Sequence, residues 1–206
     1  MTTARILVPV VDDDAAVRDS LSLLLQAAGY VSVGFASAEA LLAGLPAEAR
    51  CLIADVRMPG GMDGVCLVET LRRRGIPLPV ILVSGHGDIP LAVRAIKAGA
   101  ADFIEKPYQA TTILGTVAAT LASRPAGALP ADLPDAEAER QIAALSPRER
   151  EVLVGLVAGK LNKTIAHDLG ISPRTVEVHR AHLMEKLGVR SLSAAVRLAL
   201  SAGLGS

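Results

Sequence analysis

Four short stretches of this 206-residue sequence carry side chains that could bind a metal ion and a phosphoryl group. Three carboxylates stand together at Asp12–Asp14, another follows an apolar run at Asp55, a hydroxyl lies at Ser84 and an amine at Lys106. Neighbouring carboxylates repel each other by roughly 4 kcal/mol at about 4 Å when the effective dielectric constant is about 20. A hard divalent cation relieves that repulsion, and oxygen ligands with room for water and a phosphoryl group favour Mg²⁺.

At such a site Asp55 would attack a phosphorus atom in line and form an aspartyl phosphate. The metal ion, Lys106 and Ser84 would neutralise the phosphoryl oxygens. The structural alternative is that Asp12–Asp14 only cap a helix and that Lys106 is an ordinary surface residue. For any single position the two interpretations are equally plausible, but the set of residues as a whole favours the phosphoryl-accepting site.

The elements that must position these residues alternate between strand and helix. Three runs are short and almost continuously apolar, which is typical of strands buried on both faces of a parallel sheet: Ile6–Val11, Cys51–Ala54 and Val80–Val83. Val31–Phe35 is weaker and is expected at an edge, and Asp102–Ile104 is a short fifth strand. Helical 3.6-residue periodicity lies between the strands. The pattern predicts an α/β fold with a five-stranded, parallel, doubly wound sheet of the flavodoxin-like kind.

Ligands of such sheets bind beyond the carboxyl ends of the strands. The first expected strand ends in Asp12-Asp13-Asp14, the third in Asp55 and the fourth in Ser84, and Lys106 follows the fifth. The candidate residues are therefore expected at one edge of the sheet. Pro9 is an anomaly, because a proline inside a central strand removes a hydrogen-bond donor.

The zero net charge, from 21 basic and 21 acidic side chains, hides a division of the chain. Residues 146–206 hold nine basic and five acidic side chains, whereas residues 125–145 hold one basic and four acidic ones together with three prolines. We therefore predict a domain at residues 1–124, a linker at 125–144 and a small basic domain at 145–206.

Composition excludes several classes of protein. A hydrophobic content of 51% is too high for a disordered chain, and two cysteines make neither a disulfide framework nor a zinc site. The apolar runs are too short to span a bilayer, and the start of the chain lacks a signal pattern. These features predict a soluble, cytoplasmic protein.

The basic domain carries the signals of four helices. Ser146-Pro147-Arg148-Glu149 forms a capping box, with serine as N-cap and glutamate three residues later. Asn162 is expected to cap a second helix, Gly170 to make a turn, and Ser172-Pro173 to begin a third helix that ends near Leu187. A helix, a short turn with glycine and another helix form a helix-turn-helix, and a fourth helix braces it. The small C-terminal domain is thus predicted to be all-α.

The helical wheel of residues 173–187 separates the core side from the side that could reach DNA. Val176, Leu183 and Leu187 share the core side. Val178 and Ala181 point outward, where small apolar groups suit a thymine methyl, and Glu177 could accept a hydrogen bond from a cytosine amino group. A protein-interaction module is the alternative. The residues predicted to contact DNA are Lys163, Thr164, Arg174, Thr175, Glu177, Val178, Arg180, Ala181 and His182.

Four motifs in residues 1–124 resemble those of the receiver domain of two-component response regulators. They are Val-Val-Asp-Asp-Asp (10–14), Asp-Val-Arg-Met-Pro-Gly (55–60), Val-Ser-Gly-His-Gly-Asp (83–88) and Phe-Ile-Glu-Lys-Pro (103–107). Two features depart from the family pattern. Ser84 stands where this subgroup often has threonine, and Gly60-Gly61 adds a glycine that could loosen the loop after Asp55 and alter the lifetime of the phosphoryl group.

The resemblance implies a role for each matching residue. It makes Asp55 the phosphoacceptor, and it makes Asp12 and Asp13 the acidic pair that binds Mg²⁺, with the backbone carbonyl of Arg57 as a further ligand. It also makes Lys106 the lysine of the site, and Ser84 and Phe103 the hydroxyl and the aromatic residue of the switch.

Residues 145–203 resemble LuxR-type helix-turn-helix domains through LSPREREVL, NKTIAHDLGIS and PRTVEVHRAHLMEKLGV. The combination of both domains resembles the FixJ/NarL subfamily of response regulators, closest to its FixJ-like members. The resemblance implies a transcription factor that a sensor histidine kinase phosphorylates. It also implies a homodimer that binds double-stranded promoter DNA, usually as an activator that works with RNA polymerase.

Two other functions remain open from the residues. A Mg²⁺-dependent phosphatase with an aspartyl intermediate would need a second acid two residues after the nucleophile, where Arg57 stands. Steady turnover is therefore not expected, although slow self-dephosphorylation is. A regulator that binds DNA without phosphorylation would use the first domain only for dimerisation, and the complete acidic set argues against it.

Overall fold

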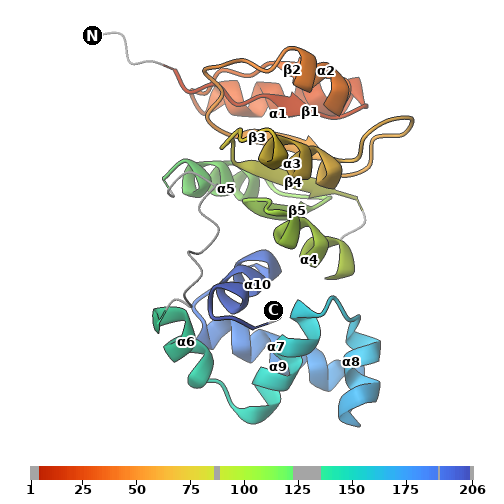
Figure 1. Ribbon diagram of the computed structural model, residues 1–206, viewed down its shortest axis with the longest axis vertical. Helices are drawn as coiled ribbons and strands as arrows, with labels where there is room; N and C mark the ends of the chain where they lie inside the picture. Colours follow the sequence, from red (N-terminus) through yellow and green to blue (C-terminus); the bar gives the residue numbers. More distant parts are fainter. Residues whose placement is uncertain (1–4, 86–88, 123–135, 190, 205–206) are drawn as a thin grey trace. The chain divides into compact units, whose positions relative to one another are not determined.

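The computed structural model describes residues 5–85, 89–122, 136–189 and 191–204 (Figure 1). The chain divides into two compact units, residues 1–87 with 98–128 and residues 88–97 with 129–206. The predicted domain boundaries at residues 124 and 145 stay predictions.

Five parallel strands form one sheet in the order β2-β1-β3-β4-β5. They are β1 (Val10–Val11), β2 (Gly34–Phe35), β3 (Leu52–Asp55), β4 (Val80–Ser84) and β5 (Asp102–Glu105). Helices follow them along the chain: α1 (Ala15–Ala27), α2 (Ala38–Ala43), α3 (Gly64–Arg73), α4 (Ile89–Ala98) and α5 (Ala110–Ala122). The doubly wound α/β fold predicted from the sequence is confirmed.

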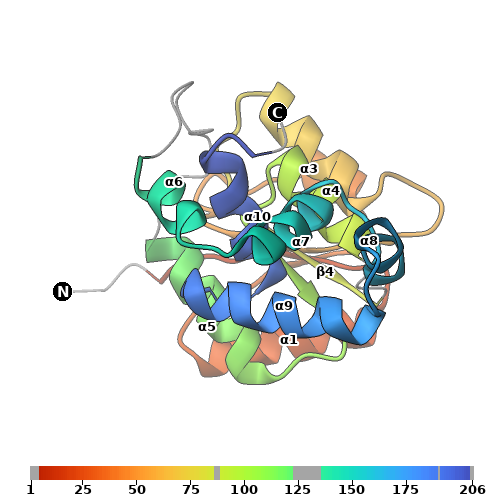
Figure 2. The same cartoon turned by 90° about the horizontal axis from the view of Figure 1, so that it is seen from below.

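One buried cluster of the core lies on the face of the sheet that α1 and α5 cover, against β1, β3, β4 and β5. Leu21 and Leu25 of α1 and Ile113 and Val117 of α5 pack there, on side chains such as Ile53 of β3. Helix α3 packs on the opposite face, which Figure 2 shows from below. Every strand that ends at the candidate site is thus held rigidly by apolar contacts.

Pro9 explains why the first strand is shorter than predicted. The Pro9 carbonyl accepts a hydrogen bond of 3.0 Å from the Ile53 amide, so the backbone of Pro9 faces β3. Proline has no N–H to return a bond to β3, and the ladder is interrupted at this point. Only Val10–Val11 form a regular strand, and Leu7 makes isolated bridges to Val31 and Ala49.

The second part of the chain folds into helices α6 (Ala136–Ala143), α7 (Pro147–Val157), α8 (Asn162–Leu169), α9 (Pro173–Lys186) and α10 (Leu192–Ser201). The four predicted helices are α7 to α10. Helix α6 lies inside the segment predicted as a linker, where acidic residues and alanine hide its amphipathic pattern. Ala138 and Ile142, four residues apart, are buried, and α6 packs beside α10. Residues 125–135 of the predicted linker lie outside the described residues.

The capping box at the start of α7 also joins this helix to the end of α9. Glu149 Oε2 accepts hydrogen bonds of 2.8 Å from both the Ser146 amide and Lys186 Nζ. The hydrogen bond from Lys186 is the largest of the causes that lower the pKa of Glu149 from 4.5 to about 2. The carboxylate is only 4% exposed, so its ionised form depends on these partners.

We predict that Glu149→Gln destabilises the helices α7 and α9 at neutral pH. The pKa of Glu149 is lower in the folded protein than in the unfolded chain. The ionised carboxylate therefore stabilises the fold above about pH 4.5, and this contribution is lost as the pH falls toward about 2. The difference between variant and wild type should therefore shrink over that range. Urea titrations of the full chain, followed by NMR signals of α7 and α9 at several pH values, measure this difference. A difference in stability between variant and wild type that does not change with pH would contradict the prediction.

Candidate functional site

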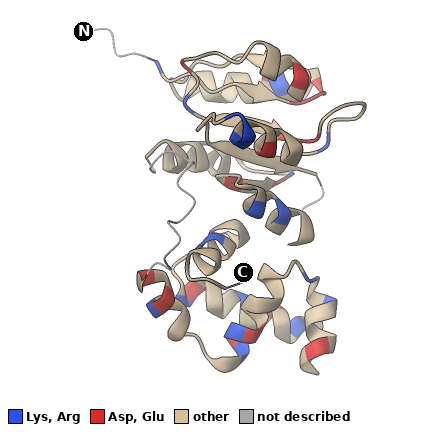
Figure 3. Cartoon of the chain, viewed as in Figure 1, with Lys and Arg blue, Asp and Glu red and all other residues tan. Residues whose placement is uncertain are grey.

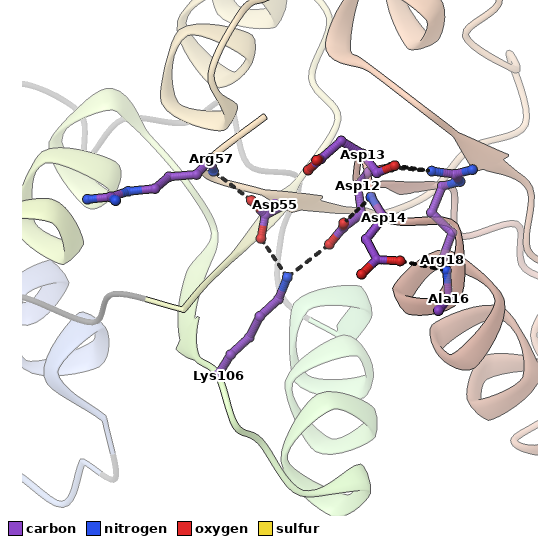
Figure 4. A network of polar contacts seen from close by, with 8 residues as sticks. All are labelled: Asp12, Asp13, Asp14, Ala16, Arg18, Asp55, Arg57 and Lys106. Carbon is purple, nitrogen blue, oxygen red and sulfur yellow. Dashed lines mark hydrogen bonds and ion pairs between the residues drawn. The ribbon is translucent and has the colours of Figure 1, made fainter. Parts of the chain in front are cut away.

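The structure brings Lys106 between two buried carboxylates at one edge of the sheet. Lys106 Nζ lies 2.6 Å from Asp55 Oδ1 and 2.9 Å from Asp12 Oδ2 (Figure 4). Asp55 is 7% exposed and Asp12 is 3% exposed. These three residues come from the ends of β3, β1 and β5, which are far apart in the sequence.

The strand register explains why these residues meet. Val11 of β1 is paired with Ala54 of β3, directly before Asp55, and Ser84 of β4 is paired with Glu105 of β5, directly before Lys106. The Lys106 amide also donates a hydrogen bond of 2.8 Å to the Ser84 carbonyl, which continues the ladder past the end of β5. Parallel pairing therefore places all these strand ends at a common edge.

Burial and charge act in opposite directions on the two ionised partners. Burial raises the pKa of Asp55, and the hydrogen bond from Lys106 opposes this rise. Burial acts to lower the pKa of Lys106, but hydrogen bonds to Asp55 and Asp12 outweigh it, so the pKa of this amine is raised. The ammonium form of Lys106 is thus stabilised, and in this form it can neutralise the negative charge of a phosphoryl group at Asp55.

The three consecutive aspartates have different environments. Asp14 caps α1, since its Oδ1 accepts a hydrogen bond of 2.8 Å from the Ala16 amide. Asp12 accepts a hydrogen bond of 2.9 Å from the Asp14 amide and contacts Lys106 with its other oxygen. Asp13 is exposed. Helix capping therefore accounts for Asp14, whereas Asp12 is directed at the candidate site (Figure 4).

Sequence reasoning did not anticipate the role of Arg18 beside this acidic run. The Arg18 guanidinium donates hydrogen bonds of 2.7 Å and 3.0 Å to the backbone carbonyls of Asp12 and Asp13 (Figure 4). An arginine one turn into a helix that follows the acidic run is the only signal for it in the sequence. Tyr108 was also missed: it is half-buried against the core, and burial raises its pKa.

The oxygen atoms at this edge fit a hard metal ion in chemical type. Asp12, Asp13 and Asp55 offer carboxylates, and Arg57 offers a backbone carbonyl, which are the donors that Mg²⁺ takes in proteins. The Arg57 amide also donates a hydrogen bond of 2.6 Å to Asp55 Oδ2, which holds this loop against the carboxylate. Among the described residues, no three histidine, cysteine or acidic side chains are gathered closely enough to hold a metal ion.

Ser84 and Phe103 lie on the two neighbouring strands β4 and β5. Ser84 is 1% exposed, and Phe103 is half-buried, with Leu82 as its register partner. The motif at 83–88 that suggested Ser84 extends beyond the described residues at 86–88. The switch role of this pair stays a prediction.

The second candidate site is the helix-turn-helix made by α8 and α9. Gly170 has a left-handed conformation, with φ of 66°, and it ends α8, while Ser172 caps α9. Val176 and Leu183 of α9 are buried, as predicted, and Val178 is 47% exposed. Five predicted DNA-contacting residues of α9 are exposed: Arg174, Glu177, Val178, Ala181 and His182.

The other four predicted DNA-contacting residues differ in their surroundings. Lys163 and Thr164 are exposed on α8, and basic residues also recur along α9 (Figure 3). Thr175 is half-buried, and its amide donates to Ser172 Oγ at 3.1 Å. Arg180 is half-buried and donates a hydrogen bond of 3.2 Å to Asn162 Oδ1. Asn162, expected as the cap of α8, is its first residue instead and braces α9.

Comparison with known protein families supports the class that the fold and the site define, a response regulator. Residues 8–118 match the response regulator receiver domain, and residues 143–199 match the luxR family of bacterial regulatory proteins. The chain therefore belongs to the NarL/FixJ family of response regulators and is FixJ-like. It is a transcription factor with a receiver domain and a LuxR-type DNA-binding domain, and this class implies DNA and a sensor kinase as partners.

Curated relatives cover almost the whole chain. The transcriptional regulatory protein FixJ of Azorhizobium caulinodans is 50% identical over 198 residues, which are 96% of this chain and 93% of the relative. FixJ of Rhizobium meliloti is 48% identical over 200 residues, 96% of this chain and 97% of the relative. These relatives are transcriptional regulators, which separates this class from the phosphatase alternative.

Solved structures agree with this assignment. Full-length FixJ from B. japonicum is 44% identical, with a TM-score of 0.54, and the match covers 98% of each chain. A structure of FixJ-N is 41% identical, with a TM-score of 0.54, and covers 59% of this chain and 98% of the other. Within the described residues, no helix has the length and apolar character that a membrane span requires.

We predict that Lys106→Met raises the pKa of Asp55 further. Burial already raises this pKa, and the variant removes the ammonium group that opposes the rise. NMR titration of ¹³C-labelled aspartate carboxyl groups, without Mg²⁺, measures the change. Lys97→Met is the control, because Lys97 is exposed on α4. An unchanged Asp55 titration in Lys106→Met would contradict the electrostatic role of Lys106.

Proposed function

We propose that a sensor histidine kinase phosphorylates Asp55 and that this modification increases binding to promoter DNA. The observation that supports it best is the ion pair of Lys106 with Asp55 and Asp12 at the edge of the sheet. Asp12, Asp13, Asp55 and the Arg57 carbonyl would hold Mg²⁺. When bound, the ion would neutralise charge on the transferring phosphoryl group.

The residues of the site have distinct tasks in this reaction. A carboxylate oxygen of Asp55 forms the new bond to phosphorus while the bond between phosphorus and the kinase histidine breaks. Lys106 already contacts Asp55 Oδ1, so its ammonium group is placed to neutralise the phosphoryl oxygens. The Ser84 hydroxyl would donate to the same oxygens, and Phe103 would turn inward behind it. This movement would change the surface of α4 and the surface of β5.

The changed surface would favour a homodimer, and two helix-turn-helix units would then bind the two halves of an imperfect palindrome. A dimer gains affinity because the second half-site is bound as an intramolecular event. In this proposal the protein works in the cytoplasm, acts as an activator and contacts RNA polymerase at the promoter. A promoter partner requires access to the chromosome, which is consistent with that location.

We predict that Asp55→Asn abolishes Mg²⁺-dependent phosphoryl incorporation from a small acyl phosphate. The amide of asparagine does not form the acyl phosphate bond. Asp14→Asn is the matched control, because asparagine caps a helix as well as aspartate and Asp14 caps α1. Intact-protein mass spectrometry, with and without Mg²⁺, measures the adduct.

Each alternative function predicts a different result, in this experiment or in an assay of phosphate-ester turnover or of DNA affinity. An adduct of equal yield in Asp55→Asn would show that another residue accepts the phosphoryl group. Rapid turnover of phosphate esters by the wild type would indicate a phosphatase. DNA affinity that is the same with and without the adduct would indicate a regulator that does not depend on phosphorylation.

We predict that two exposed residues of α9 affect DNA binding in different ways. Arg174→Ala should weaken binding to all sequences and reduce the slope of log affinity against log salt by about 1, because Arg174, exposed at the helix start, is predicted to contact phosphates. Glu177→Ala should relax preference at one base pair, with a cost of about 1–3 kcal/mol there. Binding titrations of the phosphorylated protein on a panel of single-base operator variants, at several salt concentrations, separate these effects. A uniform loss for Glu177→Ala would exclude it from base readout.

A further inference from the structure

The loop between β3 and α3 carries the two adjacent glycines that the sequence singled out as a departure from the family. Gly60 has φ of 85°, a left-handed conformation that glycine adopts without strain. A Cβ atom at Gly61 would lie 2.9 Å from Glu39 Oε1 and 3.0 Å from Glu39 Oε2. The second glycine therefore makes room for a carboxylate from another element. The loop is not simply loosened by its glycines.

Glu39 comes from the first turn of α2 and binds the loop directly. Its Oε1 accepts a hydrogen bond of 2.7 Å from the amide of Met62, which lies 23 residues further along the chain. The Met62 amide is also the largest cause that lowers the pKa of the exposed Glu39 side chain. The contact therefore favours the ionised carboxylate, which is the stronger acceptor.

Hydrogen bonds of the loop to β3 and α3 fix its two ends. At its start the Arg57 amide donates to Asp55 Oδ2 at 2.6 Å. At its end the Gly64 amide donates to the Val56 carbonyl at 2.9 Å, and Asp63 caps α3. The hydrogen bond from the Met62 amide to Glu39 attaches the middle of the loop to α2, the helix that follows the edge strand β2.

We propose that Glu39 is a positioning residue for the phosphoacceptor site, which holds the loop so that the Arg57 carbonyl is presented to Mg²⁺. This inference rests on the function proposed above. A loop already held in its bound geometry loses less conformational freedom when it binds an ion, so its affinity is higher. Glu39 does not touch the reacting atoms and acts through the loop that contains Arg57.

Substitution of Glu39 should weaken Mg²⁺ binding without unfolding the protein. In the full chain we expect Glu39→Ala to raise the Mg²⁺ dissociation constant about tenfold, as removal of an outer hydrogen-bond partner of a metal site does. Amide chemical shifts in a Mg²⁺ titration measure the constant, and hydrogen exchange of the Met62 amide should become faster. Glu39→Gln keeps an oxygen acceptor and should recover most of the affinity. Glu48→Ala, an exposed glutamate of the same unit, is the control for lost charge and should match the wild type.

Gly61→Ala tests the same contact without removing a charge. Its Cβ would displace the Glu39 carboxylate, so it should weaken Mg²⁺ binding to a similar extent. The double variant Glu39→Ala, Gly61→Ala should be no weaker than either single variant, because both remove one contact. If Glu39→Ala does not fold, as judged by thermal unfolding, Gly61→Ala alone decides the question.

Three results would overturn the inference. They are Mg²⁺ affinity in Glu39→Ala or Gly61→Ala within twofold of the wild type, a similar loss in Glu48→Ala, and additive losses in the double variant. Failure of the proposed function is a separate result, because it appears as a wild-type protein that binds no Mg²⁺ or takes no adduct at Asp55. A wild type that binds and is labelled, beside variants that do so equally well, contradicts the role of Glu39 alone.

Discussion

The contact of one ammonium group with two buried carboxylates is the constraint on which the receiver unit depends. Asp12 and Asp55 are almost fully buried. Without Lys106, their two negative charges would repel each other in a site that water hardly reaches, which is unfavourable. The three residues stand at the ends of β1, β3 and β5, so the contact forms only when the parallel register is correct. The site is therefore assembled only where the strands are correctly paired. A new dianion at Asp55 would compete with Asp12 for Lys106, which gives the site a direct electrostatic reason to reorganise.

The backbone around the site is held by side chains that do no chemistry. Arg18 fixes the carbonyls behind the acidic run, and Glu39 fixes the loop after Asp55. Each comes from a helix that follows a neighbouring strand, α1 for Arg18 and α2 for Glu39. Metal ligands are positioned to within small tolerances only when their own supports are fixed. The helices that flank the sheet thus hold the backbone of the site with polar side chains, in addition to packing apolar side chains on the strands.

The sequence allowed the sheet, its order of elements and the residues at the strand ends to be predicted, because apolar runs and parallel topology leave few alternatives. It did not predict the shortened β1, since the anomaly of Pro9 was recognised but its effect on the ladder depends on which neighbour the residue faces. Helix α6 was missed because its two buried residues, Ala138 and Ile142, are a weak signal among acidic side chains. The contact of Glu39 with Met62 spans 23 residues, and no periodicity in one segment reports such a tertiary hydrogen bond.

Helix α9 shows that exposure and chemistry must be considered together. Arg180 carries a charge suited to DNA phosphates, yet it is half-buried, burial lowers its pKa, and it donates to Asn162 at the start of α8. Its hydrogen bond ties α9 to α8, whereas Val178 and Ala181 of the same helix are exposed. Arginine has five N–H donors, so Arg180 can hold Asn162 and still make its predicted contact with a DNA phosphate. The exposed side chains of α9 would then remain to read base edges.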